Sequence, residues 1–77
     1  MAIVVKFFAS LRESLDIAET RINPADASTV ADVWSLATDN ADMPPNTLIA
    51  INMEYVDKSQ RVNDGDEVAF FPPVSGG

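Results

Sequence analysis

The chain has 77 residues, of which five are basic and twelve are acidic, so its formal net charge at pH 7 is −7. It contains no cysteine and no histidine, which excludes disulfides, a thiol nucleophile, an imidazole general base and the usual metal sites. The acidic charge makes nucleic acid and anionic membranes poor partners, and no apolar stretch approaches the roughly 20 residues of a membrane-spanning helix. We expect one small cytoplasmic domain that is not an enzyme by itself.

A strand is predicted at the start of the chain, over residues 3–8 (Ile-Val-Val-Lys-Phe-Phe), because β-branched and aromatic residues favour strands. Side chains of a strand alternate between its two faces. Lys6 therefore marks the outward face, which Phe8 shares. The inward face is expected to carry Ile3, Val5 and Phe7.

A short helix and a second strand are expected next. Ser10 and Glu13 have the spacing of a capping box, in which each side chain bonds a free amide at the helix start. Leu11 and Leu15 lie four residues apart and give this helix one apolar edge. Residues 19–22 (Glu-Thr-Arg-Ile) predict a strand antiparallel to the first.

The main helix is predicted from Thr29, a good N-cap residue with Asp32 three positions later. The following apolar residues have helical spacing and define one buried face, namely Val30, Val33, Trp34 and Ala37. The helix should end before residues 42–45, because two prolines there cannot continue it.

Three further strands complete the expected sheet. The apolar run at residues 48–52 suits a central strand covered on both faces, and residues 55–58 suit a short edge strand. A turn at residues 63–66, with Gly65 at positive φ, leads into the last strand at residues 67–71. In that last strand Phe70 should face the core and Phe71 the outside.

This order of elements predicts an α+β fold, with a mixed sheet packed on one main helix. It is the arrangement of the ubiquitin-like β-grasp. The predicted domain covers residues 1–71. Residues 72–77 are expected to form an extended, flexible C-terminal tail.

The tail begins with two prolines, which lack amide donors and favour a stiff extended exit. Its side chains then shrink toward the end of the chain, in the order Pro73, Val74, Ser75, Gly76 and Gly77. Six extended residues reach about 20 Å, so such a tail can enter a narrow channel. Chain ends are often rich in small residues without any such role. Here, however, the decrease in side-chain size follows two prolines directly after a compact domain, which favours a function for the tail.

Both ends of the chain resemble the family of molybdopterin synthase small subunits, which are ubiquitin-like sulfur carriers. The resemblance rests on residues 7–13 (Phe-Phe-Ala-Ser-Leu-Arg-Glu) and above all on residues 64–77, which end Phe-Phe-Pro-Pro-Val-Ser-Gly-Gly. Residues 29–32 and 50–52 fit the same pattern, so it spans the whole chain. One departure is the lack of a glycine in residues 15–18, after the first helix.

The resemblance implies that the carboxylate of Gly77 is the working group. An adenylating partner enzyme would use ATP and Mg²⁺ to convert it to an acyl-adenylate, and sulfur from a persulfide would then leave a thiocarboxylate. The carrier would deliver this sulfur to a cyclic pterin precursor, and two deliveries would complete the dithiolene that holds molybdenum. The chain itself would bind no cofactor and show no activity alone.

The implied partners are the large synthase subunit, the adenylating enzyme and a sulfurtransferase or cysteine desulfurase, with a heterotetramer of two small and two large subunits. Two outward phenylalanines beside the tail, Phe8 and Phe71, predict an exposed apolar patch of the kind found at interfaces. The alternative is that both rings close the edge of the core. The resemblance adds Arg12 and Tyr55 as contacts to partners.

Three other functions stay open. The carrier that supplies sulfur for thiamine thiazole synthesis shares the diglycine and the fold, although the long Phe-Phe-Pro-Pro-Val-Ser approach favours the pterin pathway. A ubiquitin-like modifier would join Gly77 to lysines of target proteins after the same adenylation step. A plain protein-interaction domain would leave the taper of the tail unexplained.

Overall fold

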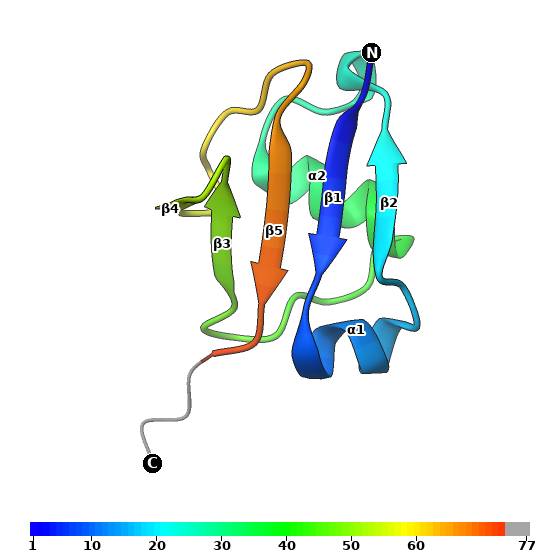
Figure 1. Ribbon diagram of the computed structural model, residues 1–77, viewed down its shortest axis with the longest axis vertical. Helices are drawn as coiled ribbons and strands as arrows, with labels where there is room; N and C mark the ends of the chain where they lie inside the picture. Colours follow the sequence, from blue (N-terminus) through cyan, green and yellow to red (C-terminus); the bar gives the residue numbers. More distant parts are fainter. Residues whose placement is uncertain (74–77) are drawn as a thin grey trace.

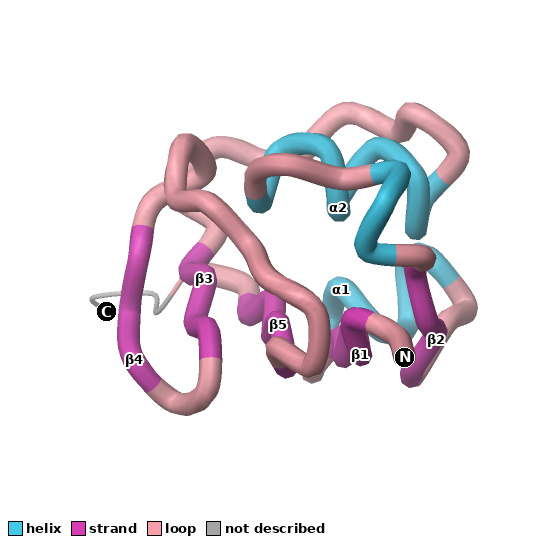
Figure 2. Tube along the Cα trace, turned by 90° about the horizontal axis from the view of Figure 1, so that it is seen from above, coloured by secondary structure: helices cyan, strands magenta, loops and turns pink. Residues whose placement is uncertain are grey.

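The computed structural model describes residues 1–73. Its elements are, in chain order, β1 (Ile3–Phe7), α1 (Ala9–Leu15), β2 (Glu19–Ile22), the 3₁₀ helix η1 (Pro24–Asp26), α2 (Val30–Thr38), β3 (Leu48–Ile51), β4 (Glu54–Val56) and β5 (Glu67–Phe71). The strands form one sheet in the order β2-β1-β5-β3-β4, and α2 crosses one face of it (Figures 1 and 2). The predicted α+β architecture is confirmed.

The sheet is mixed, as predicted. β1 and β5 run parallel at its centre, whereas β2 pairs antiparallel with β1, and β3 pairs antiparallel with both β5 and β4. The parallel pair brings the first and the last strand of the chain side by side, with Phe7 opposite Phe70. The residues that follow β1 and β5 therefore emerge at the same end of the sheet (Figure 1).

Helix α2 begins where the sequence predicts. The Thr29 hydroxyl accepts a hydrogen bond from the Asp32 amide, and the Asp32 carboxylate accepts one from the Thr29 amide, which completes a capping box. The amides of Val30 and Ala31 donate to carbonyl groups of the loop between β4 and β5, so the first turn leaves few unpaired donors. With nine residues α2 is the longest described helix, and none between residues 1 and 73 could span a membrane.

The core lies between α2 and the inner face of the sheet. Three aromatic rings form its centre, because Phe7 stacks on Phe70 at a centroid distance of 5.5 Å and the Trp34 ring meets both edge-on. The indole N–H of Trp34 donates to the carbonyl of Ala41. The fully buried aliphatic residues around these rings are Ile3, Val5, Val30, Val33 and Val68.

The predicted capping box at Ser10 and Glu13 is wrong. Helix α1 starts at Ala9, two residues before the start that a Ser10 cap implies, and its N-cap is Phe8, whose side chain makes no capping hydrogen bond. The reason is that the Phe8 amide still donates to the carbonyl of Phe70, at 3.1 Å, and so extends the pairing of β1 with β5. Ser10 is thereby placed inside the helix, where its hydroxyl cannot cap the start.

The prediction that β3 is covered on both faces is also wrong. Within residues 1–73 only one face of the sheet carries a helix, and the other face is turned toward the reader in Figure 1 with α2 behind it. On this open face Tyr55 of β4 is 75% exposed. Ala50 of β3 is nevertheless buried on this face, where its methyl group lies between Tyr55 and Ala69 of the neighbouring strands.

Candidate functional site

The predicted carrier residues Val74, Ser75, Gly76 and Gly77 lie outside the described residues. The approach to them is described: Pro72 is half-buried and Pro73 is exposed, directly after β5. Figure 1 shows this exit at the end of the sheet where α1 also lies. The structure thus fixes where the tail begins, and its predicted chemistry stays a prediction.

Phe8 and Phe71 meet beside this exit. Their rings stack with centroids 4.7 Å apart and an interplanar angle of 9°. Phe8 is 39% exposed and Phe71 is half-buried, whereas their neighbours Phe7 and Phe70 are buried in the core. The outward direction predicted for Phe8 and Phe71 is confirmed, and the pair forms an apolar surface next to the start of the tail.

Arg12 and Tyr55, the other predicted contacts, lie on either side of this pair. Arg12 is exposed on α1 and its amide reaches the carbonyl of Phe8 at 3.4 Å. Tyr55 stands on the edge strand β4 opposite Ala50, and its ring shares the open face with Phe71. The structure therefore places Phe71 and Tyr55 on one face of the sheet, with Phe8 stacked on Phe71 and Arg12 in the helix that follows Phe8.

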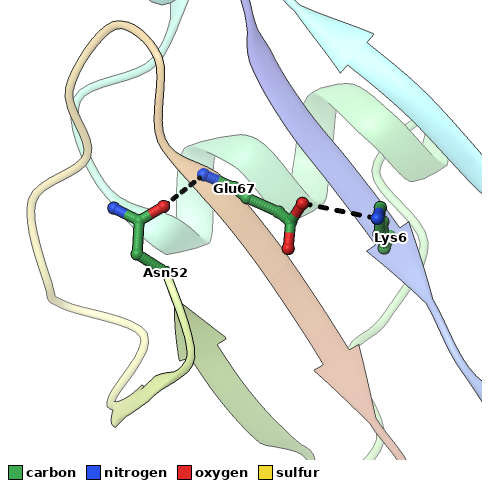
Figure 3. Close-up of polar contacts among 3 residues, drawn as sticks. All are labelled: Lys6, Asn52 and Glu67. Atoms are coloured by element: carbon green, nitrogen blue, oxygen red, sulfur yellow. Dashed lines mark hydrogen bonds and ion pairs between the residues drawn. The ribbon is translucent and has the colours of Figure 1, made fainter.

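The opposite end of β5 is held by two polar contacts (Figure 3). The Asn52 carboxamide oxygen accepts a hydrogen bond from the Glu67 amide at 3.0 Å, and the Glu67 carboxylate pairs with the Lys6 ammonium at 3.3 Å. The pair is exposed, so its contribution to stability is small, about 0–1 kcal/mol. Asn52 was not predicted to have this role, because its partner lies fifteen positions away along the chain.

Two aspartates have a pKa below the ordinary value of 3.8 for the side chain. Hydrogen bonds from the backbone amides of Ser28 and Thr29 lower the pKa of Asp32, and the hydroxyl and amide of Ser59 lower that of Asp57. Both groups stabilise local structure, one at the start of α2 and one in the loop after β4. The chemistry predicted for the tail needs neither of them, because it uses no titrating side chain.

Comparisons with known proteins agree with this arrangement. The chain matches the ThiS family over residues 5–77. It is 39% identical to the molybdopterin synthase sulfur carrier subunit of Escherichia coli K12, and the match covers 97% of this chain and 99% of that protein. Each chain thus spans nearly the whole length of the other.

Two solved structures share the fold. The crystal structure of SAMP1 from Haloferax volcanii has a TM-score of 0.77 at 27% identity, with all of both chains covered. A chain from the complex of subunits 1 and 2 of molybdopterin-converting factor from Helicobacter pylori has a TM-score of 0.68 at 22% identity, again over both full chains. The ubiquitin-like β-grasp prediction is confirmed. The chain therefore belongs to the ThiS family, and its similarity to a molybdopterin synthase sulfur carrier subunit confirms the resemblance that residues 7–13 and 64–77 carry.

Proposed function

We propose that this protein is the sulfur carrier subunit of molybdopterin synthase. The observation that carries the proposal is the partly exposed Phe8–Phe71 pair at the point where the chain leaves the sheet toward Gly77. It combines an apolar docking surface with the start of a tapering tail. The full-length similarity to the carrier subunit of E. coli supports the pterin pathway over the thiamine pathway.

In this function the terminal carboxylate of Gly77 carries the sulfur. A free carboxylate resists nucleophilic attack, so a partner enzyme first uses ATP and Mg²⁺ to form an acyl-adenylate and releases pyrophosphate. The outer sulfur of a persulfide, provided by a sulfurtransferase or cysteine desulfurase, then displaces AMP and forms an acyl disulfide with the donor. A second thiol cleaves the sulfur–sulfur bond, which releases the thiocarboxylate and leaves that thiol in a disulfide with the donor sulfur. Gly76 and Gly77 have no side chains that obstruct entry into a narrow active site.

The receiving partner is the large synthase subunit, which holds the catalytic side chains. A fold neighbour from H. pylori was solved as a complex of subunits 1 and 2 of molybdopterin-converting factor, which supports this pairing. The contact is carried by Phe8 and Phe71, with Arg12 and Tyr55 at its borders. The assembly expected is a heterotetramer of two small and two large subunits.

A second function is favoured by the similarity to SAMP1 of Haloferax volcanii. The abbreviation stands for small archaeal modifier protein 1. As a protein modifier, the chain would form an isopeptide bond between Gly77 and a lysine of a target protein. Adenylation would be shared by both functions, and only the acceptor would differ. The two products, a thiocarboxylate on Gly77 and an isopeptide bond from Gly77 to a lysine, differ in mass.

The test is the intact mass of the protein isolated from its native cells, followed by fragmentation of the C-terminal peptide. We expect a mass shift equal to the exchange of one oxygen for sulfur, located on Gly77. A Gly77 found only in isopeptide bonds to lysines would make the modifier function primary. Freshly adenylated protein incubated with a persulfide donor and a thiol reductant provides the positive control, because thiocarboxylates hydrolyse during isolation.

A further inference from the structure

The backbone of Phe8 is shared between the sheet and helix α1. Its amide donates to the carbonyl of Phe70 at 3.1 Å, which continues the pairing of β1 with β5. Its carbonyl instead accepts the amides of Leu11 at 3.2 Å and of Arg12 at 3.4 Å, at the start of α1. Leu11 is buried and holds this helix against the core. Phe8 therefore belongs to the sheet through its amide and to the helix through its carbonyl.

The register of β1 and β5 shows which donor the Phe8 carbonyl would otherwise accept. The Val4 amide donates to the carbonyl of Asp66 at 3.0 Å, and the Phe8 amide, four residues later, donates to Phe70. Both bonds follow the same parallel register. In a parallel ladder the bonds are evenly spaced, and a residue that donates to the neighbouring strand also accepts from it, two residues further along. The next bond of this ladder would therefore join the Phe8 carbonyl to the amide of residue 72.

Residue 72 is a proline, which has no amide hydrogen. The ladder therefore ends at the amide of Phe8, and the carbonyl of Phe8 is left to α1. Any other residue at this position would bring a donor to a carbonyl that the helix already uses. The end of the sheet and the start of α1 would then compete for one acceptor.

This competition would change the direction in which the chain leaves the sheet. A ladder bond at residue 72 would keep the strand beside β1 and carry it toward α1, which follows β1. In the structure the chain after β5 turns away from that helix (Figure 1). Pro72 is half-buried and Pro73 is exposed, so the chain leaves the domain between these two residues. The direction of its exit is therefore set at Pro72.

The inference rests on the proposed function, in which Gly77 reaches an active site of the large synthase subunit. We propose that Pro72 is a positioning residue for this transfer, because it withholds an amide hydrogen from the Phe8 carbonyl and so fixes where the chain leaves the domain. It touches no reacting atom and acts through the backbone of Phe8. Gly77 follows five positions later, and a small misplacement of a reacting group is enough to slow its reaction strongly.

Pro72→Ala supplies the missing amide hydrogen and tests the proposal. The carrier is chemically synthesised with a C-terminal thiocarboxylate and mixed with an excess of purified large subunit, so that the rate does not depend on affinity. Formation of the dithiolene in a single turnover should be at least about tenfold slower than for wild type. Thermal melting shows that the variant is folded, since an added ladder bond does not weaken the sheet. An unchanged rate for the folded variant would overturn the proposal.

Two further substitutions separate the missing hydrogen from the stiffness of the proline ring. Pro72→N-methylalanine removes the ring but still provides no amide hydrogen, so it should restore the wild-type rate. Pro73→Ala adds a hydrogen one position later, where the amide points away from β1 because successive residues of a strand alternate. It should slow the reaction less than Pro72→Ala. If N-methylalanine does not restore the rate, or if Pro73→Ala is equally slow, stiffness positions the tail and the proposal is wrong.

Amide hydrogen exchange of Pro72→Ala, followed by NMR, tests the contacts without any partner. The new amide at residue 72 should be protected, and the amides of Leu11 and Arg12 should exchange severalfold faster than in wild type. An unprotected residue 72 with unchanged exchange in α1 would overturn the competition for the Phe8 carbonyl. A wild-type carrier that forms no product with the large subunit would instead contradict the proposed function, and the exchange measurement would still decide the role of Pro72 at Phe8.

Discussion

Phe8 and Phe71 come from opposite ends of the chain, yet their rings stack with centroids 4.7 Å apart. The parallel pairing of β1 with β5 brings them together, because Phe7 lies opposite Phe70 and each of the outer rings follows directly after its inner neighbour. The inner pair builds the core, and the outer pair builds a surface. At the end of each strand the inner phenylalanine therefore serves stability, and the outer one is free to serve the docking proposed above.

Removing the outer ring should weaken docking. We expect Phe71→Ala to reduce affinity for the large subunit by more than about 1 kcal/mol, or about fivefold in Kd, since aromatic anchors dominate interface energies. Leu36→Ala is the control, because Leu36 is an apolar residue that is 49% exposed on α2. An unchanged Kd for Phe71→Ala in calorimetry would mean that the ring only closes the edge of the core.

Removing the inner ring should instead damage the fold. Phe70 is fully buried and contacts the rings of Phe7 and Trp34. Truncation of such a residue costs about 3–5 kcal/mol, which is a large part of the stability of a small domain. Urea denaturation followed by Trp34 fluorescence measures the loss for Phe70→Ala. A loss below about 1 kcal/mol would contradict the packing described here.

The alternation of side chains in β1 and β5 was enough to predict which phenylalanines face inward, because one charged residue on each strand, Lys6 or Glu67, marks the outer face. The stacking of Phe8 on Phe71 was not predictable in the same way. It depends on the parallel register of two strands distant in sequence, for which neither strand carries a local signal. The local alternation thus predicts which rings face outward, whereas the pairing of β1 with β5 brings these rings together.

The two wrong predictions have related causes. Ser10 and Glu13 have the correct spacing for a cap, but the backbone of Phe8 continues the sheet and starts the helix at Ala9. The apolar run of β3 suggested two covered faces, whereas one of its faces is part of the open face of the sheet. A sequence cannot distinguish a residue that is apolar for the core from one that is apolar for a surface open to a partner.

The hairpin between β3 and β4 offers a test of local strain. Asn52 and Met53 both have positive φ, at 49° and 72°, as in the two-residue turns that favour Asn-Gly. Positive φ costs an L-residue about 1–2 kcal/mol, and glycine avoids this cost. Glycine also loses more conformational entropy on folding, which offsets part of the gain. We expect Met53→Gly to raise stability by about 0.5–1 kcal/mol in thermal melting.

The control for this substitution is Asn52→Gly, which relieves the same kind of strain but also removes two side-chain hydrogen bonds. The Asn52 carboxamide bonds the Glu67 amide and the Asp66 carboxylate. Asn52→Gly should therefore lower the melting temperature. A higher melting temperature for Asn52→Gly, or a lower one for Met53→Gly, would show that the turn is held by something other than these contacts.

Acid should weaken the start of α2 through Asp32. Its pKa in the folded protein is lowered from 3.8 by backbone hydrogen bonds, so the fold favours the carboxylate. The resulting stabilisation is fully present above the unfolded value of 3.8 and is lost as the pH falls through the lower folded value. Asp32→Asn should melt below wild type at pH 6, and this difference should shrink as the pH is lowered from about 4.

The same pH series on Asp42→Asn provides the comparison, since Asp42 is exposed in the loop between α2 and β3. Its melting temperature should follow that of wild type across the series. If Asp32→Asn and wild type differ equally at pH 6 and at pH 3, the charge of Asp32 contributes nothing and only the shape of the side chain matters.

The end of the chain is the most direct test of the carrier mechanism. Deleting Gly77, or adding one residue after it, moves the terminal carboxylate by about 3.5 Å, which is larger than the tolerance of a positioned reacting group. Since Phe70 is the last residue of the core among residues 1–73, seven positions before Gly77, both variants should keep the melting temperature of wild type. In synthase assembled with the purified large subunit and chemically prepared thiocarboxylate, both should fail to form the dithiolene product. One extra residue before Met1, which is 99% exposed, should leave product formation unchanged. Full activity from either C-terminal variant would contradict a mechanism that depends on where Gly77 is placed.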